Sequence, residues 1–169
     1  WGVNDNFDWE TMQMQPIDVD KQYNFFNPRL GVSYTFADRH KFYASAAIAH
    51  KEPTRSDFTD RYMFAKDQTQ PKSELLYDYE LGYDYTSPVV SLAANLYYMK
   101  YRNQLIPTGM VNDSSDALNV NVPDSYRLGV ELTAAVRPTR WFTLGGSATF
   151  SRNKILDYVD MLADSPTYG

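Results

Sequence analysis

The amino-acid sequence predicts an all-β protein, an up-and-down antiparallel transmembrane β-barrel of which this chain forms a partial wall of about six strands in three hairpins. Two observations predict this fold. Six segments alternate apolar and polar residues for ten or more positions, whereas strands of soluble proteins usually run about 5 to 6 residues and a tilted membrane-crossing strand needs about 9 to 11. The connections between these segments are alternately short and long, as in bacterial outer-membrane barrels.

Composition agrees with a membrane β-barrel and excludes several other classes. The 169 residues include 14 Tyr, 9 Phe and 3 Trp, yet no apolar run is long enough for a transmembrane helix. The absence of cysteine removes disulfides, thiolate nucleophiles and zinc sites of the cysteine type. A net charge of -5 argues against nucleic acid as a partner, because neutralising phosphates requires clustered Lys and Arg.

The first hairpin is expected to join strands at about 26–36 and 41–50 through a short turn at 37–40. Every second residue of the two strands is apolar, which gives each strand one apolar face. That face carries Leu30, Val32, Tyr34, Phe36, Phe42, Ala44, Ala46 and Ile48. A long polar loop, Lys51 to Pro71, is expected to follow.

The second hairpin is expected to join strands at about 72–86 and 89–104 through Ser87 and Pro88. Its apolar face carries Leu75, Tyr77, Tyr79, Leu81, Tyr83, Tyr85, Val90, Leu92, Ala94, Leu96 and Tyr98. We expect Leu105 to Pro123 to form a second long loop. Loops of this length between tight hairpins are typical of the extracellular side of a barrel.

The third hairpin is expected to join strands at about 124–137 and 141–154 through a turn at 138–140. Its apolar face carries Tyr126, Leu128, Val130, Leu132, Ala134, Val136, Phe142, Leu144, Ala148 and Phe150. The barrel wall is therefore expected to span residues 24–154. Residues 1–23 are expected to be an irregular lead-in or extracellular loop, and residues 155–169 the start of a third long loop.

The two faces have different expected surroundings. Aromatic residues near the short turns and aliphatic residues in the middle of the apolar face resemble the girdle of a bilayer interface. The opposite face carries mostly Ser, Thr, Asn and Gly, so it must meet water or another polar domain. The residues expected to face this lumen include Asp78, Glu80, Asn95, Arg127, Glu131 and Ser147.

Turn geometry also predicts a pairing register for two hairpins. A primed two-residue turn at Ser87 and Pro88 is disfavoured because it requires positive φ, so a four-residue loop is preferred. That loop sets Glu80 opposite Asn95. In the third hairpin, a compact turn at 138–140 and the requirement that paired residues share a face set Glu131 opposite Ser147 and Leu132 opposite Gly146.

Catalytic and metal-binding motifs are weak in this sequence. His40 and His50 lack a second histidine at i+3 or i+4, and there is no G-x-S-x-G elbow. The carboxylates of Asp78, Glu80 and Asp84 are better explained by lumen-facing hydrogen bonds than by acid/base catalysis. Asp57, Asp60 and Asp67 lack the glycine-centred pattern of a calcium loop. We therefore expect no enzyme activity, no cofactor and no metal site.

The first long loop supplies the candidate ligand-binding residues. Aromatic residues on an otherwise polar loop often mark a contact surface, although packing against neighbouring loops explains them equally well. The candidates are Arg55, Asp57, Phe58, Tyr62 and Phe64.

Several short motifs, in their order along the chain, resemble the barrel of TonB-dependent outer-membrane receptors. They cover about residues 24–153. The motifs are Asn27-Pro28-Arg29-Leu30-Gly31, Tyr43-Ala44-Ser45, His50 to Phe58, Lys72-Ser73-Glu74, Tyr79-Glu80-Leu81-Gly82-Tyr83 and Ser125 to Leu132.

This resemblance implies a 22-stranded barrel filled by a plug domain and energised by TonB through a short N-terminal box, of which the present chain would be one piece. It implies a receptor in the outer membrane of a Gram-negative bacterium that imports a scarce nutrient, such as an iron chelate, cobalamin or an oligosaccharide. The expected partners are outer-membrane lipid, the plug of the same receptor, TonB and an unidentified small-molecule ligand. A passive porin or adhesin barrel is the alternative, and a soluble β-sandwich binding module is a third interpretation.

A protease tests the topology. We expect trypsin added to intact cells to cleave within Lys51 to Pro71, at Lys51, Arg55, Arg61 or Lys66, because an external loop is accessible. Mass spectrometry of the released peptides identifies the site. Cleavage at Arg39 or Arg140 instead would place the short turns outside the cell and invert the topology.

Overall fold

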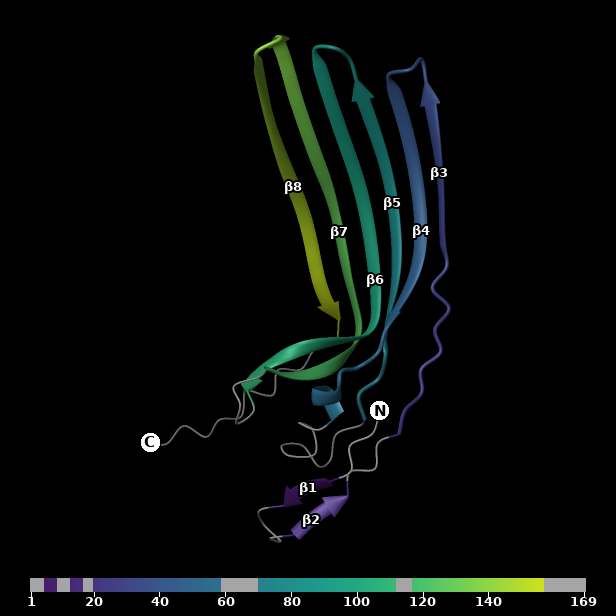
Figure 1. The fold of residues 1–169 in the computed structure, drawn as a ribbon, viewed down its shortest axis with the longest axis vertical. Coiled ribbons are helices and arrows are strands. Elements are labelled where there is room, and N and C mark those ends of the chain that lie inside the picture. The colour runs from purple at the N-terminus through teal and green to yellow at the C-terminus, as the bar shows by residue number, and fades with distance from the viewer. Residues whose placement is uncertain (1–4, 9–12, 17–19, 59–69, 112–116, 157–169) are drawn as a thin grey trace, which may run out of the picture.

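The computed structural model describes residues 5–8, 13–16, 20–58, 70–111 and 117–156. Its main feature is a six-stranded antiparallel sheet in which each strand pairs with its neighbours in chain order (Figure 1). The strands are β3 (Arg29–Phe36), β4 (His40–Lys51), β5 (Glu74–Thr86), β6 (Val90–Val111), β7 (Ala117–Thr139) and β8 (Phe142–Leu156). The predicted all-β, up-and-down architecture is confirmed.

A second, much smaller sheet lies in the region expected to be irregular. Within residues 1–23, β1 (Asp5–Asp8) pairs with β2 (Gln13–Pro16) as a short antiparallel hairpin. The large sheet lies apart from this hairpin in Figure 1.

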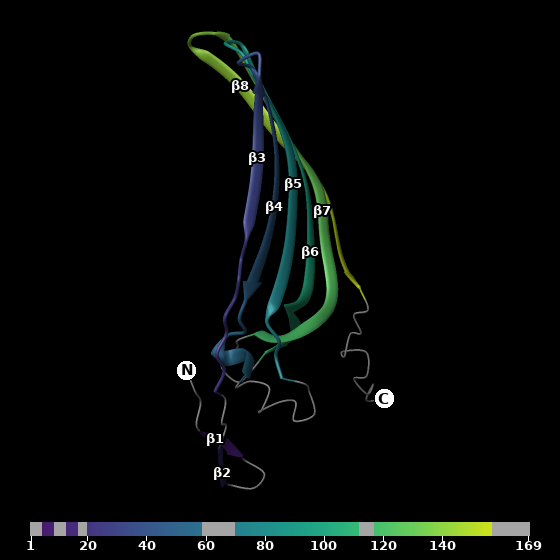
Figure 2. The same cartoon turned by 90° about the vertical axis from the view of Figure 1, so that its right-hand side faces the viewer.

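The sheet is one layer thick and curved. The three short turns lie together at one end, and β4 ends and β5 begins toward the other (Figure 1). Turned by 90°, the strands twist and bow rather than lying flat (Figure 2), as the right-handed twist of strands requires. This is the shape of a segment of barrel wall.

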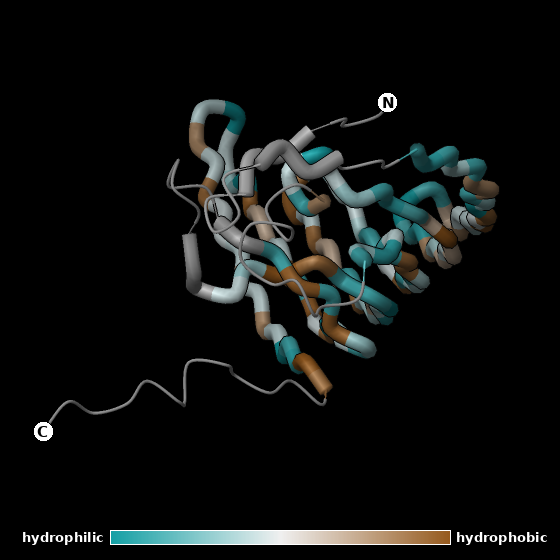
Figure 3. Tube along the Cα trace, turned by 90° about the horizontal axis from the view of Figure 1, so that it is seen from below, coloured by the Kyte–Doolittle hydropathy of each residue, from teal (hydrophilic) through white to brown (hydrophobic). Residues whose placement is uncertain are grey.

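The pairing register aligns apolar side chains across all six strands. One row of direct partners is Val32, Ala44, Leu81, Leu96, Val130 and Phe150, and the next is Tyr34, Phe42, Tyr83, Ala94, Leu132 and Ala148. We call this surface the apolar face and the opposite one the polar face. Hydrophobic and hydrophilic residues accordingly alternate along the strands in Figure 3.

The apolar face has no cover among the described residues. The side chains of Leu81 and Phe150 are 57% and 68% exposed, and many other large apolar side chains of this face are also exposed. A water-soluble monomer rarely exposes an apolar surface this extensive. Such a face is typical of a surface that lies against hydrocarbon or another apolar partner.

The height of the apolar face matches a bilayer. On β7 its uncharged positions run from Tyr126 to Val136, which is about 34 Å along a strand at about 3.4 Å per residue. A tilt of about 35 to 45° reduces this length to about 24 to 28 Å, and the apolar band of outer-membrane barrels is about 25 Å tall.

Aromatic girdles border this band at both ends. Phe42 contacts Tyr83 near the short turns, with ring centroids 4.8 Å apart. At the other end Tyr98 lies between Tyr79 and Tyr126, at centroid distances of 6.5 and 6.3 Å. Amphipathic rings at two levels of one face are typical of the two interfaces of a membrane.

The predicted register of two hairpins is wrong by two residues. Glu80 lies opposite Tyr97, and Asn95 lies opposite Gly82. In the third hairpin Glu131 lies opposite Thr149, and Leu132 lies opposite Ala148. Because two residues are one full period of the pleat, the assignment of residues to faces is unaffected.

Both turns lie beside a proline. In the second hairpin Ser87 donates its N–H to the Val90 carbonyl at 2.8 Å, and Ser87 Oγ accepts from the Val90 N–H at 2.9 Å. Pro88 thus takes the second position of the turn, where its fixed φ fits. In the third hairpin the register shifts between Val136 and Thr139, around Pro138, which cannot donate to the ladder.

The predicted second long loop is also wrong. β6 continues to Val111 and β7 begins at Ala117, with Leu105 opposite Asn121. The two strands bend sharply at the end far from the short turns (Figure 1). Near this level Asn103 has a φ of 52° and Pro123 lacks an N–H. Asn tolerates this left-handed conformation better than most residues. The continued pairing beyond it shows a bent hairpin in place of most of the predicted loop.

No helix among the described residues combines the length and the apolar character needed to cross a bilayer. Helical structure in the described loop is confined to residues 55–58.

A paired arginine scan at one level of β7 tests the two faces. Leu132 lies on the apolar face between Ala94 and Ala148, and Thr133 lies on the polar face between Ala93 and Ser147. Leu132→Arg is expected to impair outer-membrane insertion of the full receptor, because a lipid-facing arginine at the midplane costs about 2 to 4 kcal/mol. Thr133→Arg should have a much smaller effect. Heat-modifiable gel mobility measures the folded fraction, and equal losses in the two variants would contradict the assignment.

Candidate functional site

The polar face carries the predicted lumen-facing residues. The structure places Asp78, Glu80, Asn95, Arg127, Glu131 and Ser147 on this one face. Its two central rows are Ser33, Tyr43, Gly82, Asn95, Glu131 and Thr149, and Gly31, Ser45, Glu80, Tyr97, Gly129 and Ser151. Acidic, amide and aromatic side chains therefore meet at the centre of the wall.

Two tyrosines lie over glycines of the next strand. A Cβ at Gly82 would overlap the ring of Tyr43, and a Cβ at Gly129 would lie 2.6 Å from Tyr97 Cζ. Tyr43 of β4 is opposite Gly82 of β5, and Tyr97 of β6 is opposite Gly129 of β7. The two pairs lie on successive rows of the polar face. Each ring thus fills the space that a larger residue would occupy and locks neighbouring strands together.

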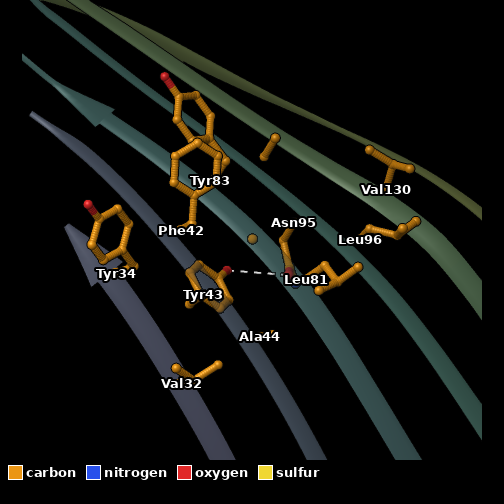
Figure 4. Close-up of a pocket in the computed structure, with 12 residues that line it drawn as sticks. Val32, Tyr34, Phe42, Tyr43, Ala44, Leu81, Tyr83, Asn95, Leu96 and Val130 are labelled. Carbon is orange, nitrogen blue, oxygen red and sulfur yellow. Dashed lines mark hydrogen bonds between the residues drawn. The ribbon is translucent and has the colours of Figure 1, made fainter. Parts of the chain in front are cut away.

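Tyr43 also reaches the strand beyond its glycine. Its hydroxyl donates to Asn95 Oδ1 at 3.3 Å, a bond that links β4 to β6 across β5 (Figure 4). The sequence analysis placed Asn95 on the polar face but did not identify this contact. Finding it requires the register, because the two residues are 52 positions apart.

Glu80 and Glu131 lie beside these tyrosines. Glu80 is directly opposite Tyr97, and Glu131 is directly opposite Asn95. Among the described residues neither carboxylate forms an ion pair. The nearby cations are engaged with aromatic rings instead: Lys41 Nζ lies 5.8 Å from the Tyr43 ring centroid, and the Arg127 guanidinium lies 5.4 Å from that of Tyr101.

The beginning of the first long loop is held by a capping box. The Thr54 hydroxyl and the Thr54 N–H both donate to Asp57 Oδ2 at 2.7 Å, and the Asp57 N–H donates back to Thr54 Oγ1 at 3.4 Å. This reciprocal arrangement starts the helical turn at residues 55–58.

Two asparagines tie the loop to the bent hairpin of β6 and β7. Asn119 Nδ2 donates to Asp57 Oδ1 at 2.9 Å. The side chain of Asn121 accepts from the Lys72 N–H at 2.8 Å and donates to the Lys72 and Asn103 carbonyls at 2.9 and 2.7 Å. Both ends of the loop are therefore fastened to β7. The sequence did not predict this role of Asn119 and Asn121, because residues 105–123 were expected to form a loop.

The candidate ligand-binding residues have different surroundings. Arg55 is exposed, whereas Asp57 is only 7% and Phe58 only 1% exposed. Tyr62 and Phe64 lie outside the described residues, as do Asp60 and Asp67. Lys51 to Pro71, expected to be a polar and accessible loop, is anchored by apolar side chains at its start, because Pro53 and Phe58 are fully buried. Asp57 and Phe58 serve to fix the loop.

The two histidines have protein partners. His40 Nδ1 is 2.8 Å from the Tyr83 hydroxyl, and His50 Nδ1 is 2.9 Å from Asn27 Oδ1. Phe25 stacks on His50 with centroids 5.0 Å apart. Tyr23 in turn stacks on Phe25. Burial raises the pKa of the Tyr23 hydroxyl, and the Glu52 carboxylate raises it further. Within the part of the chain that the structure describes, no group of three potential ligands could hold a metal ion.

Comparison with known proteins identifies the family. The model of the TonB-dependent receptor-like β-barrel family matches residues 3–168. The chain therefore belongs to this family, whose members are receptors and transporters of the Gram-negative outer membrane rather than enzymes. No curated protein sequence matches the chain.

Solved structures support the fold. The copper transporter OprC superposes with a TM-score of 0.61 and 18% sequence identity, covering 75% of this chain and 20% of that one. The FrpB iron transporter from Neisseria meningitidis (F3-3 variant) gives a TM-score of 0.59 and 20% identity, covering 76% of this chain and 20% of that one. The chain thus spans about one fifth of these transporters.

A double-mutant cycle tests the interlocking of tyrosine and glycine. Gly82→Ala is expected to destabilise the receptor by about 1 to 3 kcal/mol, because the added methyl overlaps the Tyr43 ring. The same change in a Tyr43→Ser background should cost far less. Thermal unfolding of the purified receptor measures both, and an undiminished cost in the second background would contradict the contact.

Proposed function

We propose that this chain is a wall segment of an outer-membrane receptor that binds and actively imports a scarce nutrient into a Gram-negative bacterium. The observation that carries this proposal is the two-sided wall. One side is a continuous apolar face of bilayer height, and the other is a polar face with glutamates that lack ion-pair partners among the described residues. Membership of the receptor family supports it.

The polar face supports a filled barrel. Glu80 and Glu131 lie two strands and one row apart, which corresponds to about 10 Å across the strands and about 7 Å along them. Carboxylates at this spacing can receive the cationic groups of a polar domain inside the barrel. We assign that role to the plug domain of the same receptor, with TonB acting on the plug.

Ligand recognition is assigned to the long-loop end of the wall. Arg55 is exposed there, and Tyr62 and Phe64 follow in the same loop. The fold is shared with a copper transporter and an iron transporter, so a metal chelate is the first substrate class to test, before cobalamin and oligosaccharides. A passive porin or adhesin is the alternative, and it requires neither TonB nor a plug.

Uptake measurements on the full-length receptor test the proposed function. Cells that carry the receptor should accumulate one labelled ferric chelate, cobalamin or oligosaccharide, and deletion of TonB should abolish this uptake. Uptake that persists without TonB would identify a passive porin. A receptor that stays in the soluble fraction would contradict the proposed location in the outer membrane.

The glutamates are expected to hold the plug. Glu80→Gln and Glu131→Gln each leave a plug cation without its partner, and breaking a buried pair in this way costs about 3 to 5 kcal/mol. We expect faster proteolysis of the plug in purified receptor and a lower uptake rate. Asp38→Asn, in the turn between β3 and β4, removes the same charge as a control. Plug proteolysis that matches the control would contradict the role.

A further inference from the structure

A group of cations lies where the apolar face ends. Going away from the short turns, the first charged residues on this face of β6 and β8 are Lys100, Arg102, Arg152 and Lys154. The register brings them together around β7: Lys100 and Lys154 are both partners of Tyr126, Arg152 is opposite Leu128, and Arg102 is opposite Asp124. We call these four residues the rim cations.

The rim cations form a compact patch on neighbouring strands. β6, β7 and β8 run side by side (Figure 1). Lys100 and Lys154 are separated by one intervening strand, or about 10 Å, and each row is about 7 Å from the next. The four side chains can therefore reach a single bound headgroup.

Positive charge in this patch exceeds the negative charge beside it. Asp124 Oδ1 lies 3.7 Å from Lys100 Nζ and 4.0 Å from Arg102 Nε. One carboxylate is thus shared by two cations. Arg152 and Lys154 are exposed and have no ion-pair partner among the described residues.

The patch lies at the depth of lipid headgroups. Tyr98 and Tyr126 belong to the aromatic girdle far from the short turns. Tyr126 is on the same row as Lys100 and Lys154, and Tyr98 is on the same row as Arg152. In outer-membrane barrels the short turns are periplasmic, so this girdle marks the outer leaflet. A protein buried in the lumen cannot neutralise the rim cations, because they share the face of the lipid-exposed residues.

We propose that the rim cations bind the phosphate groups of an anionic glycolipid in the outer leaflet, of the diphosphorylated lipid A type. Two arginines offer planar, forked donors to phosphate oxygens, and two lysines add point charges. Asp124 orients Lys100 and Arg102 and weakens binding by repulsion. This inference rests on the proposed location in the outer membrane.

Lipid retention by the full-length receptor tests the site. Receptor purified from outer membranes is titrated with diphosphorylated lipid A, with the same lipid after removal of its phosphates, and with inorganic phosphate, and native mass spectrometry measures binding. We expect Lys100→Gln with Lys154→Gln to weaken binding of the diphosphorylated lipid by about fivefold for each cation removed. Arg39→Gln with Arg140→Gln removes two charges at the short turns and should change little.

A second variant gives an opposite shift that misfolding cannot imitate. Asp124→Asn is expected to strengthen lipid binding by about fivefold, because it removes the only carboxylate of the patch. Salt should weaken binding in wild type more than in the double glutamine variant.

Other results overturn the inference. Equal retention of both lipids, unchanged binding in the two variants, full competition by inorganic phosphate, or a protein bound in place of the lipid would each do so. If these occur in a receptor that inserts and imports normally, the proposed function stands and only the lipid site fails. If the wild-type receptor does not insert into the outer membrane, both proposals fail.

Discussion

The two-residue period of the pleated strand is the constraint on which the rest of this structure depends. Because their backbone N–H and C=O groups pair with neighbouring strands on both sides, β4 to β7 can enter hydrocarbon without leaving polar backbone unpaired. The register then aligns rows such as Leu81, Leu96 and Val130 into one continuous surface. A shift of one residue in the register of β5 or β7 would bring Glu80 or Glu131 into the lipid.

On the polar face, side-chain contacts between strands, and not a buried hydrophobic core, add to the backbone pairing of the wall. Tyr43 and Tyr97 cover glycines of adjacent strands, and the Tyr43 hydroxyl reaches Asn95 two strands away. These contacts stiffen a sheet that is only one layer thick. They also occupy the aromatic rings with the wall itself, so that the carboxylates of Glu80 and Glu131 are the groups left to meet a polar domain.

The two ends of the wall are built differently. At one end tight turns leave little backbone beyond the membrane, whereas at the other β6 and β7 bend and hold the preceding loop through Asn119 and Asn121. The carboxylate of Asp57 serves both the capping box and this attachment. At this same end the rim cations follow directly after the aromatic girdle, so loop anchoring and lipid contact occupy neighbouring levels of the wall.

The sequence by itself determined the strands, their faces and the family resemblance, because alternation is a local property of consecutive residues. Six predicted polar-face residues, from Asp78 to Ser147, lie on one face for this reason. Only the tertiary structure decided which residues are partners, because alternation is the same for two registers that differ by two residues. It also decided that residues 105–123 are largely a bent hairpin and that Phe58 is buried. The hairpin and the attachment of the loop depend on contacts between residues far apart in the chain, such as Asp57 with Asn119, which no local pattern records.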